Sequence, residues 1–85
     1  MGTPPIYPCD FPIKAFMRPD AQAEAALIRR IEAALGPGTR LDVGRRSSAH
    51  GRYVCLTLRF RARDAAHARR IGALVHRDER VLMAL

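Results

Sequence analysis

Residues 52–63 read RYVCLTLRFRAR, and this stretch decides the fold because apolar residues recur in it at a period of two. The apolar set is Val54, Leu56, Leu58 and Phe60. The positions between and beside them are Tyr53, Cys55, Thr57, Arg59 and Arg61. Side chains alternate between the two faces of a strand, so the pattern predicts a half-buried β-strand whose second face carries arginine.

Basic residues gather around this strand. The segment 40–63 contains Arg40, Arg45, Arg46, Arg52, Arg59, Arg61 and Arg63. Its single acidic residue is Asp42, so most of the chain's net charge of +7 is expected on one hairpin.

The composition is that of one globular domain. A chain of 85 residues has enough apolar surface for a single core, and 48% hydrophobic with 27% charged residues is ordinary for a soluble protein. No apolar run approaches the roughly 18 residues of a membrane span, and the first residues lack the build of a signal peptide. We therefore expect a cytoplasmic protein that does not bind membranes.

The chain divides into an arm and a domain. Residues 1–10 contain prolines at positions 4, 5 and 8 and predict a flexible, extended arm. The single domain is expected to span residues 11–85. Its first strand is predicted over residues 11–18, where alternation ends at Pro19.

Two helices are predicted. Asp20 is a good N-cap for the first, whose apolar stripe recurs at helical spacing until residues 36–38, Gly-Pro-Gly, end it. Asp64 can cap the second, which residues 76–78 close. A second strand begins with Leu41 and Val43, residues 47–51 have the composition of a turn, and residues 80–85 predict a last strand.

The resulting order is βαββαβ. It predicts an α+β, ferredoxin-like sandwich, with both helices on one face of a four-stranded antiparallel sheet. The other sheet face is left for solvent, a second copy of the chain or a ligand.

Several motifs resemble the YbeD-like family of small bacterial proteins. They are residues 7–14 (YPCDFPIK), the serine pair 47–48, residues 51–57 (GRYVCLT), and His76 followed by residues 81–85 (VLMAL). The resemblance implies a ferredoxin-like fold similar to ACT domains, a cytosolic bacterial protein without known enzymatic activity, and a regulatory or ligand-sensing role.

One loop departs from that pattern. Many members of the family have a glycine between the first strand and the first helix, where backbone amides can approach a small ligand. This chain has Arg18-Pro19-Asp20 there. Proline lacks an amide hydrogen and Arg18 adds bulk, which argues against an amino-acid site on this loop.

No catalytic or metal-binding constellation is recognisable. Ser47, Ser48 and His50 are close in sequence, but their place in a turn favours a structural role. The three histidines have no ligand spacing, and Asp78 with Glu79 fits a solvated turn. Cys9 and Cys55 are expected as reduced thiols. We therefore expect no enzymatic activity, no catalytic residue, no metal and no cofactor.

The favoured interpretation is a docking surface on the open sheet face and the basic hairpin. Its expected contact residues are Arg45, Arg46, Arg52, Tyr53, Arg59 and Arg61. The partner would be a protein or a small anionic metabolite. A homodimer, sheet to sheet or edge to edge, is a further expectation, because Phe16, Tyr53, Cys55 and Thr57 would be exposed.

Two alternatives stay open. The same arginines could bind RNA or DNA phosphates without reading sequence, since RNA-recognition modules share the βαββαβ order. Position 55 is cysteine and position 57 is threonine, however, where such a module would carry a second stacking ring. The second alternative is a charged surface that serves only solubility.

Overall fold

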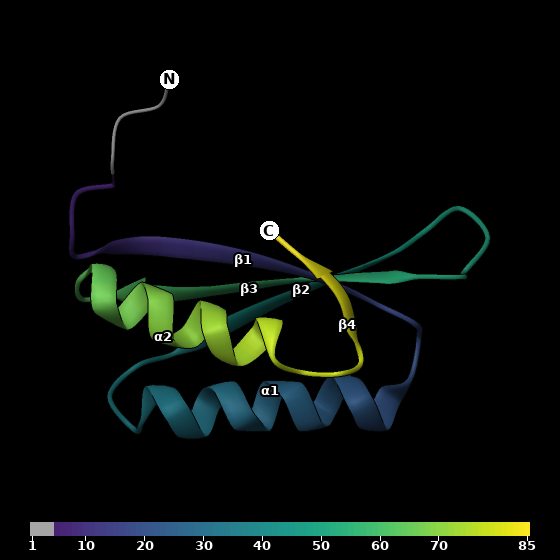
Figure 1. Ribbon diagram of the computed structural model, residues 1–85, viewed down its shortest axis with the longest axis horizontal. Coiled ribbons are helices and arrows are strands. Elements are labelled where there is room, and N and C mark those ends of the chain that lie inside the picture. Colours follow the sequence, from purple (N-terminus) through teal and green to yellow (C-terminus); the bar gives the residue numbers. More distant parts are fainter. Residues whose placement is uncertain (1–4) are drawn as a thin grey trace.

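The computed structural model describes residues 5–85. The elements, in chain order, are β1 (Cys9–Met17), α1 (Ala21–Leu35), β2 (Leu41–Ser47), β3 (Val54–Ala62), α2 (Ala65–His76) and β4 (Val81–Ala84). The sheet is four-stranded, antiparallel and ordered β2-β3-β1-β4. Both helices lie on one side of it, and the β2–β3 hairpin extends beyond them (Figure 1). The predicted ferredoxin-like sandwich is confirmed.

The core lies between the sheet and the helices. The four apolar residues of β3, from Val54 to Phe60, are at most 2% exposed, as their alternation predicted. Leu27 and Ile31 of α1 and Ile71 and Val75 of α2 are fully buried against them. Each such side chain contributes about 1.5–3 kcal/mol when taken out of water, so the two helical stripes secure the helices to this face.

The helix ends follow the predicted caps. Asp20 Oδ1 accepts hydrogen bonds from the N–H groups of Gln22 and Ala23 at 3.0 and 3.1 Å. Asp64 Oδ1 accepts one from the N–H of His67 at 2.8 Å. Gly36 follows α1 with a φ of 82°, a left-handed conformation that favours glycine.

Strand β1 begins earlier than predicted. Cys9 and Asp10, which were assigned to the arm, pair with Ala62 and Arg61 of β3. Of the rest of the arm, residues 1–4 lie outside the described part of the chain, and residues 5–8 precede the strand. β3 is long enough to pair with Cys9 and Asp10, so β1 begins at Cys9. The local sequence of residues 9 and 10 does not show this pairing.

Pro12 lies within β1 although β1 is an inner strand. Lys14 exchanges both of its backbone hydrogen bonds with Leu85, at 3.1 and 2.9 Å, on the β4 side. Pro12 is two residues from Lys14, so its backbone nitrogen is directed to the same side of β1, at a place beyond the end of β4. Its missing N–H therefore interrupts no ladder.

Strand β4 spans residues 81–84, slightly less than the predicted 80–85, and its register with β1 shifts between Phe16 and Met17. Among the described residues, no helix is long and apolar enough to cross a membrane.

Candidate functional site

The open face of the sheet is crossed by rows of side chains that the strand register defines. From the hairpin end, the rows are Arg46–Cys55–Phe16, Gly44–Thr57–Lys14 and Asp42–Arg59–Pro12, each in the order β2, β3, β1. Strand β3 runs through the middle of this face and turns its apolar residues to the helices. The alternation in residues 52–63 thus identified the open face correctly.

A hollow of about 190 Å³ opens at the hairpin end of this face. Its lining is Phe16, Arg46, Ser47, Ser48, Tyr53, Val54 and Cys55. We call it the hairpin-end hollow. Two residues of the predicted docking surface, Arg46 and Tyr53, meet there beside Phe16 and Cys55. Tyr53 is 46% exposed, so part of its ring is available to a partner.

The hairpin loop holds this arrangement through its backbone. The N–H of Tyr53 donates to Ser48 Oγ at 3.1 Å, and the N–H of Ser48 donates to the carbonyl of Tyr53 at 2.9 Å. Gly51 has a φ of 66°, which the turn requires. Ser48 thus serves the turn, as its sequence context indicated, and Arg52 stands exposed in the same loop.

Arg59 and Arg61 lie at the opposite end of the open face. Arg59 is six residues from Tyr53 along the chain, which is about 20 Å in an extended strand. Arg61 Nη1 is 3.6 Å from Asp10 Oδ1, and Arg40 Nε is 3.1 Å from Asp42 Oδ1. All four side chains are well exposed, so these ion pairs contribute little to stability. The predicted surface is therefore two separate regions.

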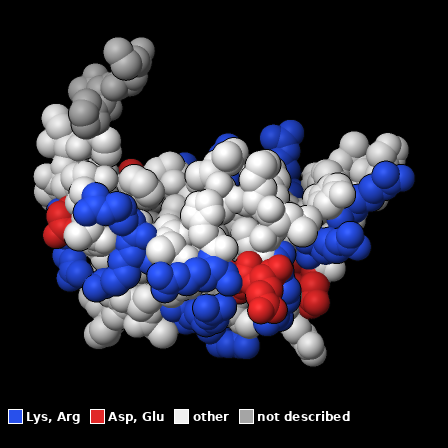
Figure 2. All heavy atoms as spheres, viewed as in Figure 1, with Lys and Arg blue, Asp and Glu red and all other residues white. Residues whose placement is uncertain are grey.

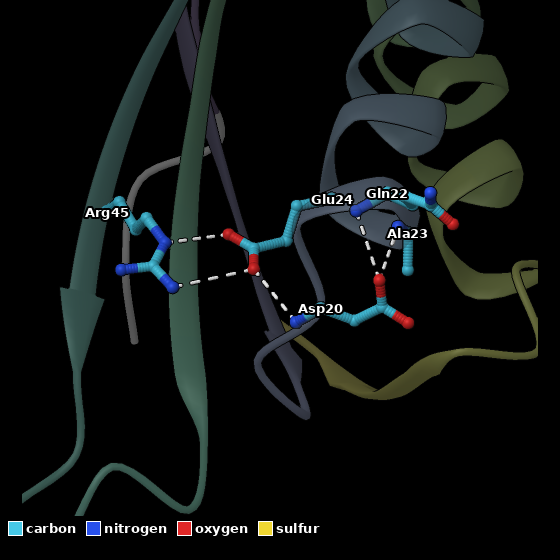
Figure 3. Close-up of polar contacts among 5 residues, drawn as sticks. All are labelled: Asp20, Gln22, Ala23, Glu24 and Arg45. Carbon is cyan, nitrogen blue, oxygen red and sulfur yellow. Dashed lines mark hydrogen bonds and ion pairs between the residues drawn. The ribbon is translucent and has the colours of Figure 1, made fainter.

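Arg45 is not on the open face, which corrects the prediction. It pairs with Leu56 in register and so belongs to the helix-facing side of β2. Its Nε donates to Glu24 Oε1 of α1 at 2.7 Å (Figure 3). The alternation of side chains along β2 could have indicated this orientation in the sequence. Arg45 shares a face of the strand with Leu41 and Val43, whereas Arg46 lies on the other face.

Glu24 connects β2 to the N-terminal end of α1. Its side chain is 9% exposed, and its Oε2 also accepts the backbone N–H of Asp20 at 3.1 Å (Figure 3). The hydrogen bond from Arg45 lowers the pKa of Glu24 below its ordinary value of 4.5, although burial acts in the opposite direction. Glu24 thus stays ionised and ties β2 to the start of α1.

Charge is spread more widely than the sequence suggested. Figure 2 shows Lys and Arg side chains over the helices as well as along the protruding hairpin. Within the basic segment, Arg45 is paired with Glu24 and Arg61 with Asp10. Arg46 and Arg52 near the hairpin end, like Lys14 and Arg59 further along the sheet, have no ion-pair partner among the described residues.

Asp78 was expected in a solvated turn, and the structure corrects this. It is 5% exposed, and its Oδ2 accepts from Arg30 Nη1 at 3.0 Å. Its Oδ1 accepts the backbone N–H of Arg80 at 2.9 Å. The partner in α1 is 48 residues away in the sequence, so no local pattern could reveal this contact.

His67 is 3% exposed at the start of α2. Its Nδ1 accepts the backbone N–H of Arg63 at 3.1 Å, and its ring packs edge-on against Phe60 with centroids 5.5 Å apart. Burial, with further effects from Arg63 and Arg70, lowers the pKa of His67 below 6.5. His67 is therefore neutral and takes part in packing near the helix cap.

The two cysteines lie on opposite faces of the sheet. Cys9 pairs with Ala62 on the helix-facing side, whereas Cys55 pairs with Phe16 on the open face. Both are free thiols, as expected. Among residues 5–85, no three His, Cys, Asp or Glu side chains gather as a metal site.

Comparisons with known proteins support the overall architecture. A family model described as "Protein of unknown function (DUF493)" matches residues 5–85, and the YbeD-like proteins are this family. No curated protein matches the chain.

One similar solved structure is the solution structure of protein HP0495 from H. pylori. It superposes with a TM-score of 0.71 at 16% sequence identity, over 99% of this chain and 88% of the other. At that identity, the likeness concerns the fold alone.

Proposed function

Because the chain belongs to the DUF493 family of proteins of unknown function, we propose a function from its own surface: a regulatory or adaptor module without catalytic activity, which binds an acidic protein segment at the hairpin-end hollow. The resemblance to YbeD-like proteins supports a cytosolic bacterial setting for this role. The observation that carries the proposal is the meeting of Phe16, Tyr53 and Cys55 with the guanidinium-bearing Arg46 around one hollow.

The size of the hollow favours a protein partner over a metabolite. Pockets that enclose whole small ligands are roughly 300–1,000 Å³. The hairpin-end hollow, at about 190 Å³, suits a single apolar side chain instead. Arg46 at the hollow and the exposed Arg52 of the hairpin loop would contact carboxylates of the partner, where charge-assisted hydrogen bonds are strong.

An NMR titration with two synthetic peptides tests the proposal. One peptide has acidic residues around a single phenylalanine, and the other has alanine in its place. We expect the first to bind about tenfold more tightly, with amide shifts at Phe16, Arg46, Tyr53 and Cys55. Arg46→Ala and Tyr53→Ala should each weaken binding by a similar factor.

The matched control is Arg29→Ala, since Arg29 is an exposed arginine of α1, away from the open face. Its replacement should leave affinity unchanged. Equal affinity for both peptides, or an equal effect of Arg29→Ala and Arg46→Ala, would show that only general charge attraction is at work. A thermal-shift screen that found strong stabilisation by an anionic metabolite would favour a small ligand instead.

One observation favours RNA binding as a second candidate function. Phe16 of β1 and Tyr53, which immediately precedes β3, line the same hollow, so two aromatic rings lie on one side of the sheet. Binding of short single-stranded RNA that needs both rings and disappears between low and moderate salt would support it. RNA binding that ignores Phe16→Ala and Tyr53→Ala would count against base stacking.

A further inference from the structure

Strand β2 is an edge of the sheet with free backbone groups. The hydrogen bond from Ser48 N–H to the Tyr53 carbonyl marks a hydrogen-bonded pair, and such pairs alternate along an antiparallel ladder. Arg46, Gly44 and Asp42 therefore direct their backbone groups to β3. The residues that direct theirs outward are Leu41, Val43, Arg45 and Ser47. Among the described residues, none of these four has a further backbone partner.

Gly44 is the central residue of β2, yet this fold does not require glycine there. A Cβ at Gly44 would meet the Cβ of Thr57 at 3.7 Å, an ordinary contact, and Gly44 has no positive φ. Glycine in a strand interior weakens the strand and often marks the close approach of another backbone. When a second strand pairs with β2 centred on Gly44, the two central Cα atoms are about 4.5 Å apart, and glycine leaves no side chain in that close contact.

A second copy of β2 fits this edge in one register. A two-fold axis through Gly44 aligns all of residues 41–47 antiparallel with their copies and pairs the outward residues with one another. On the open face it places Asp42 opposite Arg46 of the second copy, twice by symmetry. Opposite charges in such cross-strand pairs are stabilising.

Neighbouring registers are disfavoured by charge. Moving the axis to Val43 brings Arg40 opposite Arg46 of the second copy. Moving the axis to Arg45 places Arg45 opposite Arg45 of the second copy. Like charges placed directly opposite each other are destabilising, so the charges of β2 select the register centred on Gly44.

We propose that two copies of this chain associate through their β2 edges about a two-fold axis at Gly44, to form one continuous eight-stranded sheet. Val43, which is 41% exposed, would then lie beside Arg45 of the partner, whose aliphatic stem can cover it. The guanidinium of Arg46 has five N–H donors and can contact Asp42 of the second copy while still bordering the hairpin-end hollow.

Charge reversal tests the register. Asp42→Arg and Arg46→Asp should each weaken self-association of the wild type by at least about tenfold, because two attractive pairs become repulsive. An equimolar mixture of the two variants should associate again, since each repelling residue then faces an opposite charge. Sedimentation from about 10 µM to about 1 mM measures each case.

A matched control uses the ion pair between β1 and β3. Asp10→Arg and Arg61→Asp are similar exposed reversals away from the β2 edge, and they should leave the dimer intact. Circular dichroism is used to check that each variant is folded. A monomeric wild type over this range, a mixture that stays monomeric, or an equal effect of the control reversals overturns the proposal.

A cysteine at the axis gives an independent measurement. In a non-hydrogen-bonded pair the two Cα atoms are about 4.5 Å apart, within disulfide range. Gly44→Cys should therefore form an intermolecular disulfide between the two introduced thiols on mild oxidation. Ala49→Cys, an exposed position in the hairpin turn, should not, and equal cross-linking at both sites contradicts the register.

This inference goes beyond the proposed function and can fail separately from it. It depends on the backbone edge, Gly44 and the pair of Asp42 with Arg46, and its tests need no peptide. Arg46 belongs to both proposals, whereas Tyr53 belongs only to the hollow. Tyr53→Ala should abolish the peptide preference without affecting the dimer.

Discussion

At the scale of single residues, Arg45 and Arg46 are neighbours with separate roles. Arg45 reaches back to Glu24 on α1, while Arg46 borders the hollow on the open face. Alternation along a strand separates them completely, because successive side chains point to opposite faces. Substitution of the two arginines should therefore affect different properties of the protein.

Arg45→Ala should destabilise the fold more than Arg46→Ala at neutral pH. It leaves the mostly buried Glu24 carboxylate with only the Asp20 N–H as a donor. Because the folded-state pKa of Glu24 is lowered from 4.5, its contribution is present above that pH and is lost as pH falls through the folded value.

Urea unfolding at several pH values measures this difference. The gap in unfolding free energy between wild type and Arg45→Ala should shrink as pH falls from 4.5, where the unfolded chain begins to bind the proton, through the lower folded-state pKa of Glu24. A gap that stayed constant into the acid range would show that Glu24 is not responsible.

His67 should make the fold sensitive to mild acid. Its folded-state pKa lies below 6.5, so the unfolded chain binds the proton first as pH falls. Stability should be full above pH 6.5 and decline between that pH and the folded-state pKa. His67→Phe should flatten this part of the pH profile in thermal or urea unfolding, while His50→Phe, in the exposed turn, should leave it unchanged.

At the scale of elements, β1 shows how an inner strand can contain proline. The backbone nitrogen of Pro12 is directed away from β3, toward a stretch of β1 alongside which β4 does not extend. β1 therefore keeps its hydrogen bonds to β3. Proline at such a place also removes a donor from an otherwise open edge. It protects the first half of β1 from pairing with other chains.

Pro12→Thr should therefore change association more than stability. We expect a change in unfolding free energy below about 1 kcal/mol, because no ladder hydrogen bond is gained or lost within the fold. Leu58→Ala, in the buried face of β3, should cost about 2–5 kcal/mol by comparison. Light scattering on heating should show earlier aggregation of Pro12→Thr, and a large loss of stability instead would contradict this account of the edge.

At the scale of the whole molecule, protection should decrease outward from the centre of the sheet. Strand β3 lies between β1 and β2 and has more buried side chains than any other strand, whereas the short β4 and the hairpin turn are at the periphery. Amide hydrogen exchange should therefore be slowest for residues 54–60.

Hydrogen exchange at the outward-directed amides of β2 also tests the proposed dimer. At Leu41, Val43, Arg45 and Ser47, exchange should be fast in dilute solution and slower at concentrations where the chain dimerises. Protection that does not depend on concentration would mean that the β2 edge has no second copy.

Much of the architecture could be read from local patterns. The caps at Asp20 and Asp64, the stop after Leu35 and the two faces of residues 54–60 depend on neighbours within a few positions, and all were predicted. The burial of Asp78 and the pairing of Arg45 with Glu24 were not, because their partners lie 48 and 21 residues away. The start of β1 was missed for the same reason.

The sequence by itself determined the order of elements, the buried face of β3 and the excess of arginine around it, since periodicity, capping and composition are local properties. Only the tertiary structure decided which arginines share a surface. Register across β1, β2 and β3 brought Arg46 and Tyr53 to one hollow, moved Arg59 and Arg61 to the far end and turned Arg45 toward α1. The physical reason is that strand pairing relates residues far apart in the chain, and each pairing also fixes which face a side chain occupies.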